Sequence, residues 1–376
     1  MRGIEVPSKQ SDAVIIGGGI AGIVTTYYLT REGLSCTVVE RDHVASHASG
    51  FAYGGIGHLG RGGSPGPNHH VAALSAVLHA ELKDVLSEEN DIDIEYRTKP
   101  VISLAFTDEE ASAAKANMAW QELEVGTPAR WADLKDVLEI EPRINPDVIG
   151  AVVTEGNTNL HPQRLTLALS RVAERQGMTI RTGTVTGFRR EHGRVTAVTL
   201  ADGEIATSRV VLAAGPWIGQ MSRWLGVDIP VEPLKGQILR LWAPGPPVPG
   251  SISWSSQYAT SKPDGLLWTG TTEEEVGFDE TTTEEARSEI MDSVTHMLPY
   301  TADARVVMQT ACLRPVTPDK ALLLGPIPGW EGGYLATGGG RQGIFLGPGI
   351  GRVTADLILD NPLSAPIDGL TLDRFR

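Results

Sequence analysis

The segment that most constrains the fold runs from residue 13 to residue 40. It opens with four apolar residues, continues into Gly17-x-Gly19-x-x-Gly22, and after a helical apolar spacing ends in a second apolar run. That order predicts a strand, a turn, a helix and a second strand. Gly17 permits the tight turn, Gly19 lets a pyrophosphate approach the backbone, and Gly22 lets helix and strand pack closely. The diphosphate would then meet the free N–H groups at the positive end of the helix.

The second predicted strand closes on Glu40, roughly 20 residues after the glycines, as the dinucleotide fingerprint requires. Its carboxylate is placed to accept hydrogen bonds from an adenosine ribose. Glutamate here, with Arg41 next to it, favours an ADP moiety with a free 2′-hydroxyl. The segment therefore predicts a dinucleotide site, and it does not separate NAD from FAD.

Composition narrows the class of protein. A chain of 376 residues is long enough for two domains. Its formal net charge of −14 argues against a nucleic-acid or anionic-membrane surface, and no segment resembles a membrane span. Only Cys36 and Cys312 occur, without a C-x-x-C motif, which fits a reducing cytoplasm. The pair His69-His70 has no ligand-type spacing to other residues, so no metal site is expected.

The remaining chain alternates between α/β and β-rich sections. We expect a long loop over 43–70, at the sheet edge where ligands of open α/β folds bind, and a strand break at 213–215 that a cofactor can approach. Helices are predicted at 71–87, 109–124, 133–140, 162–176 and about 348–359. Strands are predicted at 95–106, 150–153, 179–181, 185–190, 195–200, 210–214, 231–242, 306–313, 322–324 and 334–337.

This alternation suggests a discontinuous nucleotide-binding domain that is interrupted twice by a second domain. We assign the nucleotide-binding domain to residues 1–98, 150–230 and 310–376, and the substrate-binding domain to residues 99–149 and 231–309.

Several motifs together resemble the D-amino-acid oxidase family of FAD-dependent enzymes, and most of all its glycine oxidases. They are GGGIAG…VVER, ASHASG, LAAGPW, LKGQ, and the tail LRPVTPDKALLLGPIP…YLATGGGRQGIFLGPGIG. The resemblance spans the whole chain. It implies FAD rather than NAD, an α/β fold with a glutathione-reductase-type FAD-binding Rossmann domain, and a β-rich α+β substrate domain whose curved sheet covers the flavin.

The resemblance also implies which residues bind FAD. They are Gly17, Gly19, Ile20, Ala21, Gly22, Glu40, Arg41, Ser46, Ser49, Gly50, Val185, Ala213, Ala214, Gly215, Trp217, Gly339, Gly340, Arg341, Gly343 and Ile344. The helix after Gly338–Gly343 would aim its N-terminus at the flavin and stabilise the negative charge of the reduced ring.

Three residues match family positions near the substrate. Arg314 falls where the family binds the substrate carboxylate, a task that suits the planar guanidinium fork. Tyr258 matches a tyrosine whose hydroxyl touches that carboxylate, and Arg341 matches a second arginine near it. The alternatives are a structural salt bridge for Arg314, a packed aromatic ring for Tyr258 and a solvated surface arginine for Arg341.

Cys312 lies seven residues before Asp319, the spacing at which related sarcosine oxidases carry a thioether to the flavin. Glycine oxidases bind FAD without such a bond, and a free cysteine is usually a small buried hydrophobe. His47 lies where sarcosine oxidases have flavin-proximal histidines, and we interpret it as structural.

The implied activity is oxidation of a small amino acid or amine of the glycine, sarcosine or D-amino-acid class. Hydride would pass from Cα to flavin N5, the imino acid would hydrolyse, and oxygen as acceptor would give H2O2. One alternative is a sarcosine- or proline-type secondary-amine oxidase with covalent flavin. Others are the flavin subunit of a hetero-oligomeric dehydrogenase and a hydroxyacid dehydrogenase. A homo-oligomer is compatible with the resemblance.

Overall fold

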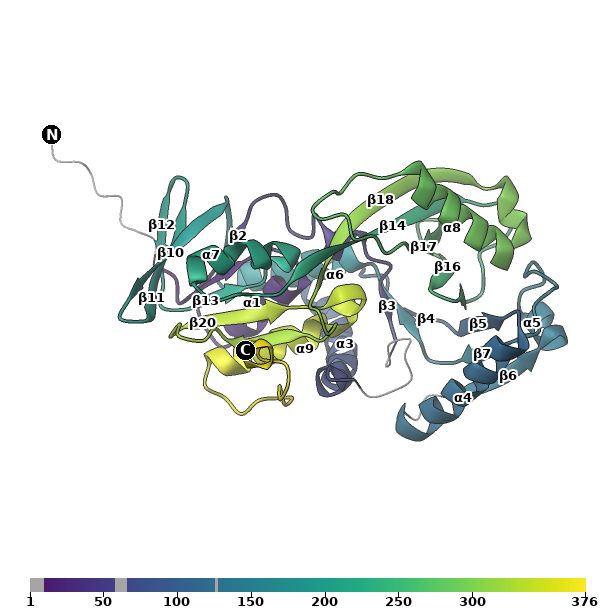
Figure 1. Ribbon diagram of the computed structural model, residues 1–376, viewed down its shortest axis with the longest axis horizontal. Helices are drawn as coiled ribbons and strands as arrows, with labels where there is room; N and C mark the ends of the chain where they lie inside the picture. Colours follow the sequence, from purple (N-terminus) through teal and green to yellow (C-terminus); the bar gives the residue numbers. More distant parts are fainter. Residues whose placement is uncertain (1–9, 58–65, 126–127) are drawn as a thin grey trace.

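The computed structural model describes residues 10–57, 66–125 and 128–376. Two large sheets organise the molecule, and they lie toward its opposite ends (Figure 1). The α/β class predicted from the sequence is confirmed. Among the described residues, no helix is both long enough and apolar enough to cross a membrane.

The first sheet has six strands in the order β19-β20-β13-β1-β2-β9. All neighbours are parallel except β19 and β20. Side chains of β1 alternate between two cores: Ala13 and Ile15 belong to one, Val14 and Ile16 to the other. The strands are β1 (Ala13–Ile16), β2 (Cys36–Glu40), β9 (Met178–Thr182), β13 (Val210–Leu212), β19 (Leu323–Pro326) and β20 (Gly333–Thr337).

Helices cover one face of this sheet. Helix α1 packs against α6 and α9, and α9 also packs against α3. Their bounds are α1 (Ile20–Arg31), α3 (His69–Glu89), α6 (Pro162–Arg175) and α9 (Gly343–Ile358). The opposite core lies under a three-stranded antiparallel sheet of β10 (Val185–Glu191), β11 (Arg194–Leu200) and β12 (Gly203–Ala206).

The second large sheet has eight strands in the order β18-β14-β17-β16-β15-β5-β7-β6. Its strands are β5 (Val101–Ala105), β6 (Ala129–Asp133), β7 (Gly150–Thr154), β14 (Glu232–Trp242), β15 (Ser251–Trp254), β16 (Gln257–Ser261), β17 (Leu267–Gly270) and β18 (Arg305–Val316). The helices α4 (Asp108–Val125), α5 (Leu134–Ile140) and α8 (Glu284–Met297) contact strands of this sheet. A small sheet of β3 (Gly55–Ile56), β8 (Thr158–Asn159) and β4 (Arg97–Thr98) completes the β structure.

The structure differs from the sequence expectations at several places. The predicted loop over 43–70 contains the one-turn helix α2 (Ala48–Phe51) and strand β3, while its residues 58–65 lie outside the described residues. The strand predicted at 150–153 pairs with β5 and β6, in the eight-stranded sheet. Strands β6, β8 and β12 were not predicted, and the last helix begins at Gly343 rather than near Pro348. The domain boundaries themselves stay a prediction.

Helix α9 accommodates Pro348 in its interior because α3 supplies the missing donor. Proline has no N–H for the carbonyl of Ile344, four residues earlier. His79 Nε2 lies 3.2 Å from that carbonyl oxygen and 3.0 Å from the oxygen of Phe345. Both partners are acceptors, so Nε2 carries the hydrogen and donates. Burial lowers the pKa of His79 to about 4, which keeps the ring neutral.

Ser75, one turn earlier on α3, also forms hydrogen bonds with the backbone of α9 near the proline. Its Oγ accepts the N–H of Gly349 over 2.9 Å and donates to the carbonyl of Leu346 over 3.1 Å. A Cβ on Gly349 would lie 2.5 Å from Ser75 Oγ, so glycine is needed for this approach. The helix can therefore continue through the proline and bring its N-terminal turn to the site described next.

Candidate active site

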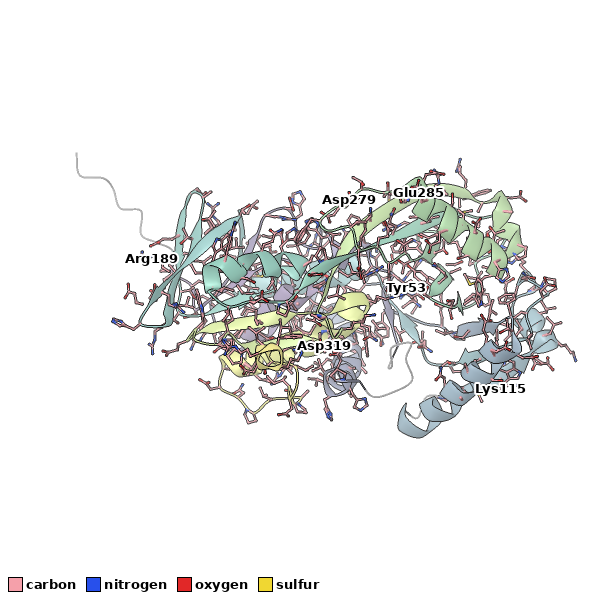
Figure 2. All side chains as sticks on the ribbon, in the orientation of Figure 1. Tyr53, Lys115, Arg189, Asp279, Glu285 and Asp319 are labelled. Carbon is pink, nitrogen blue, oxygen red and sulfur yellow. The ribbon has the colours of Figure 1, made fainter. Side chains whose placement is uncertain are left out.

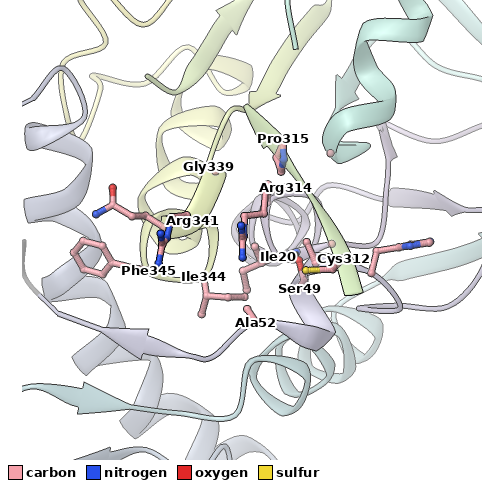
Figure 3. Close-up of a pocket in the computed structure, with 18 of the residues that line it drawn as sticks. Ile20, Ser49, Ala52, Cys312, Arg314, Pro315, Gly339, Arg341, Ile344 and Phe345 are labelled. Atoms are coloured by element: carbon pink, nitrogen blue, oxygen red, sulfur yellow. Dashed lines mark hydrogen bonds between the residues drawn. The ribbon is translucent and has the colours of Figure 1, made fainter. Parts of the chain in front are cut away.

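A cavity of about 1190 Å³ lies between the six-stranded sheet and one face of the eight-stranded sheet. The turn after β1, the turn after β13 and the N-terminus of α9 line one side of it. Strands β14, β15, β16 and β18 line the other side. In the view of Figure 3, Arg314 and Ile344 lie near the centre, with Cys312 to one side of them and Arg341 and Phe345 to the other. Groups from distant parts of the chain therefore meet in one space.

The glycines after β1 form a cradle without side chains. Gly17 has φ +109°, and a Cβ there would lie 2.5 Å from the carbonyl oxygen of Ala213. A Cβ on Gly22 would overlap the carbonyl oxygen of Gly17. Ser49 Oγ accepts the N–H of Ile20 over 2.9 Å, at the first turn of α1. The cradle leaves room for a diphosphate at the positive end of this helix.

Glu40 lies at one end of the cavity, where its carboxylate is held by backbone donors. It accepts the N–H of Gly18 over 2.7 Å and the N–H of Asp42 over 2.9 Å. Arg41 stacks over the ring of Trp217, with its Cζ 4.1 Å from the ring centroid. This end therefore offers a carboxylate and an aromatic face, which suit an adenosine group.

His47 belongs to a charged cluster at the same end. Its Nε2 lies 2.9 Å from Asp42 Oδ2, and its Nδ1 lies 2.9 Å from Glu280 Oε1. The ring also packs against Trp217. Two carboxylates therefore hold His47, as its structural interpretation expects.

All but two of the residues expected to bind FAD line this cavity. The exceptions are Gly22 and Gly50, where an added Cβ would overlap the carbonyl oxygens of Gly17 and Ala45. These two glycines allow the backbone to pack closely behind the cavity wall. The FAD contacts of the other residues stay a prediction.

Arg314 projects into the cavity from β18 and is 8% exposed. Its guanidinium donates to the carbonyl of Thr272 over 3.2 Å and to Thr271 Oγ1 over 2.7 Å. Burial lowers the pKa of this guanidinium from its ordinary value. Within the described part of the chain, no carboxylate lies within ion-pair distance of it. The salt bridge considered for Arg314 is therefore not formed with any described residue.

The period of two in β14 and β18 builds this wall of the cavity. Thr310, Cys312 and Arg314 alternate along β18, and Leu234, Gly236 and Ile238 alternate along β14. The register places Gly236 opposite Cys312 and Leu234 opposite Arg314. Because Gly236 has no side chain, the guanidinium occupies the space that a Cβ there would fill.

Tyr258, on β16, is 4% exposed and lines the same cavity. Its ring packs on that of Tyr53, with centroids 4.0 Å apart. Tyr53 lies where the two large parts of the molecule meet (Figure 2). Tyr258 is therefore a packed aromatic residue on the side that contacts Tyr53. It also lines the cavity, and its contact with the substrate stays a prediction.

Arg341 lies at the border between the two parts of the molecule. It forms an ion pair with Glu273 over 3.0 Å and donates to the carbonyl of Ser256 over 3.0 Å. Its side chain is 32% exposed. Arg341 is therefore a paired residue rather than a fully solvated one, and its predicted contact with substrate requires it to share or leave Glu273.

Cys312 is buried and lines the cavity two residues before Arg314. Burial raises the pKa of its thiol, and the nearby Arg314 charge opposes that rise. A neutral thiol is a weaker nucleophile than a thiolate. The covalent flavin link at this residue stays a hypothesis.

Sequence reasoning missed Tyr53, Gly236 and Thr271. Tyr53 belongs to the glycine-rich segment, where a lone tyrosine gives no functional signal. Gly236 and Thr271 act on Arg314 through strand pairing, and pairing between distant segments is not visible in a single sequence. Among the described residues, no group of three or more His, Cys, Asp and Glu side chains could hold a metal ion.

Comparison with known proteins gives a consistent result. The family model described as "FAD dependent oxidoreductase" matches residues 12–357. Glycine oxidase from Pseudomonas putida is 33% identical over 365 residues, 93% of this chain and 94% of that protein. Glycine oxidase from Pseudomonas aeruginosa is 31% identical, over 92% and 94% of the two chains. The crystal structure of glycine oxidase from Geobacillus kaustophilus superposes with a TM-score of 0.92, 26% identity, and 97% and 98% coverage. The similarity extends over nearly the whole chain.

Proposed function

Because the chain belongs to the family of FAD-dependent oxidoreductases, we propose that it oxidises a small amino acid or amine whose carboxylate is bound by Arg314. FAD is the cofactor of this family. The residues present fit it, since the glycine cradle, Glu40 and the N-terminus of α9 all line one continuous cavity.

The observation that carries the proposal is that Arg314 is buried in the cavity wall and forms no ion pair with any described residue. A buried charge without a partner is costly, and an anion placed against it recovers much of that cost. The guanidinium makes hydrogen bonds only to a carbonyl and a hydroxyl among the described residues. A substrate carboxylate would supply the missing charge and match the planar fork.

The chain contributes mainly by holding the substrate in place. Arg314 fixes the carboxylate, Tyr258 borders it, and Arg341 can join from Glu273. FAD, when bound, supplies the acceptor for the hydride that leaves the substrate Cα. Positioning of the reacting carbon is the principal task of the protein in such a reaction. The imino acid then hydrolyses in water to an oxo acid and ammonia or an amine, and oxygen or another acceptor reoxidises the enzyme.

Arg314→Leu tests the carboxylate assignment. We expect the variant to keep its flavin but to lose carboxylate binding by about 30-fold or more, since truncating one partner of a charged pair costs about 2–5 kcal/mol. Arg314→Lys should recover only part of the affinity because an ammonium lacks the planar fork. Arg305→Leu, an exposed arginine on the same strand, is the matched control. Wild-type affinity in Arg314→Leu would show that the carboxylate binds elsewhere.

The substrate class is read from anaerobic flavin bleaching with glycine, sarcosine, proline, and D- and L-amino acids. Bleaching by any of these supports the proposal and names the class. If none of these compounds bleaches the flavin, the proposed function is contradicted. A hydroxyacid substrate or a missing partner subunit would then be favoured.

A second candidate, a secondary-amine oxidase with covalent flavin, is favoured by the place of Cys312 in the cavity wall. Acid precipitation separates the two. Yellow colour released into the supernatant contradicts the covalent link, and yellow colour in the pellet supports it. Cys312→Ala should then release the colour.

A further inference from the structure

One part of the cavity wall is made of hydroxyl groups and has no role in the proposed function. The strand register aligns Gly270, Tyr258, Ser253 and Ser103 across β17, β16, β15 and β5. Neighbouring strands lie about 4.8 Å apart, so Ser253 is about 10 Å from β17. Arg314 donates to Thr271, the residue that follows β17. The serines therefore lie beyond the reach of a glycine held by Arg314.

Four residues form this surface, which we call the hydroxyl wall: Tyr53, Ser103, Ser251 and Ser253. All four line the cavity. The hydroxyl oxygens of Ser103 and Ser253 lie 3.1 Å apart, and those of Tyr53 and Ser251 lie 2.5 Å apart. Ser251 and Ser253 are 3% and 9% exposed, so their hydroxyls are removed from bulk water.

A buried lysine fixes the orientation of this wall. Lys262 Nζ donates to Asn159 Oδ1 over 3.2 Å and to the carbonyl oxygen of Leu160 over 3.0 Å. The amide nitrogen of Asn159 is thereby directed at Ser251 Oγ, 3.0 Å away. Ser251 in turn donates to Thr260 Oγ1 over 3.2 Å. Its hydrogen is thus committed, so Tyr53 donates to Ser251, and the Tyr53 oxygen acts toward any other partner as an acceptor.

The charge of this region indicates what it can bind. Within the described residues, the arginines and lysines that line the cavity are Arg41, Arg223, Arg314, Lys320 and Arg341, and none of them belongs to β5, β8, β15 or β16. Hydroxyls oriented by a neighbouring network are suited to a neutral group that donates or accepts hydrogen bonds. Lys262 lies behind this part of the wall, where it donates to Asn159 and to the carbonyl oxygen of Leu160, and it does not line the cavity. A second carboxylate would therefore find no cationic side chain on the wall itself.

We propose that the hydroxyl wall is a specificity site that binds a hydroxyl or amide group on the arm of the substrate beyond Cα. The preferred substrate is then an amino acid with a polar, uncharged side chain rather than glycine itself. This inference rests on the proposed function, because it assumes that Arg314 holds the carboxylate at the other end. A site built to hydrogen-bond a hydroxyl discriminates strongly against the analogue without it, since its own polar groups are left unpaired.

The test compares homoserine with 2-aminobutyrate, which is the same amino acid without its terminal hydroxyl group. Each enantiomer is mixed anaerobically with the holoenzyme, and the rate of flavin reduction is measured against concentration. We expect kcat/KM for homoserine to exceed that for 2-aminobutyrate by about tenfold. We expect Tyr53→Phe and Ser253→Ala each to reduce that ratio by about threefold or more, because each removes one hydroxyl and keeps the shape.

Ser87→Ala, at the far end of α3, is the control that removes a hydroxyl outside the cavity and should leave the ratio unchanged. Equal kcat/KM values for the two amino acids in the wild-type enzyme would overturn this inference alone. A preference for aspartate over asparagine would also overturn it, since the arm would then be charged. A flavin that no amino acid reduces would overturn the proposed function and this inference with it.

Discussion

Gly236 and Arg314 lie on adjacent strands, and the guanidinium of Arg314 occupies the volume that a Cβ at position 236 would take. This relationship explains why β14, otherwise rich in large side chains, has a glycine at this position. The same space lets the two hydrogen bonds to residues 271 and 272 form. Gly236 therefore acts on the carboxylate site through Arg314, although it carries no functional group.

Gly236→Ala should displace the guanidinium while keeping its charge. We expect binding of a carboxylate to weaken by about tenfold or more, because a bidentate pair depends on orientation as well as charge. The measurement is the perturbation of flavin absorbance by a substrate-like carboxylate. Gly187→Ala is the control, since a Cβ there meets no atom within 4 Å. Unchanged binding in Gly236→Ala would show that Arg314 finds another productive rotamer.

Gly19→Val should abolish FAD binding. A Cβ at position 19 already lies 3.2 Å from Ser49 Oγ, and the branches of valine would extend into the cradle of the diphosphate. The measurement is the ratio of flavin to protein after purification and after incubation with added FAD. Gly187→Val serves as the control for a valine in place of glycine. Full flavin content in Gly19→Val would contradict the placement of the diphosphate.

His79→Gln should reduce the acid sensitivity of the fold. Burial holds the pKa of His79 at about 4, below its ordinary value of 6.5. Between these values the unfolded chain binds the proton and the folded chain does not, so stability is lost as the pH falls from 6.5 to 4. The loss amounts to about 3 kcal/mol for this residue.

Glutamine can still donate to the two carbonyls of α9 and does not titrate. Urea unfolding at pH 7 and at pH 4.5 should therefore show a smaller difference in the free energy of unfolding for His79→Gln than for the wild type. An equal difference in both proteins would mean that His79 binds a proton as readily in the folded protein as in the unfolded chain, so that burial does not lower its pKa.

Lys262→Met should change the dependence of stability on pH at the alkaline end. Burial lowers the pKa of Lys262 to about 7 from 10.5. Between these values the unfolded chain binds the proton, so the contribution of Lys262 to stability rises from pH 7 to pH 10.5 and is lost again as the pH falls. As the pH rises from 7 to 10, the free energy of unfolding of the wild type should increase relative to that of Lys262→Met by a few kcal/mol. A constant difference would contradict this.

The elements that sequence analysis located well depend on local pattern. The segment from β1 to β2 follows from the glycine spacing and the apolar periods, and the structure confirms it. The sheet that contains β7 could not be predicted, because an apolar strand does not identify its partners. The start of α9 was misplaced because Pro348 is usually a first helical residue, and only the packing of His79 against that helix explains why it is not.

The surroundings of Arg314 were also beyond sequence reasoning. Its motif indicated a carboxylate site, but its burial, its lack of an acidic partner among described residues and the space left by Gly236 all depend on β14, β17 and β18 pairing in one register. Register between segments far apart in the chain is set by tertiary packing.

The strand order of the six-stranded sheet has a consequence for biosynthesis. Strand β1 is synthesised well before its neighbour β13, which begins at Val210, and before β20 on the far side of β13, which begins at Gly333. Until most of the chain has been made, β1 and β2 have an unpaired edge, and the helix α9 that covers α1 does not exist. Long-range pairing of this kind slows folding and exposes apolar edges to aggregation. We therefore expect slower translation or added chaperone to raise the soluble yield of this protein.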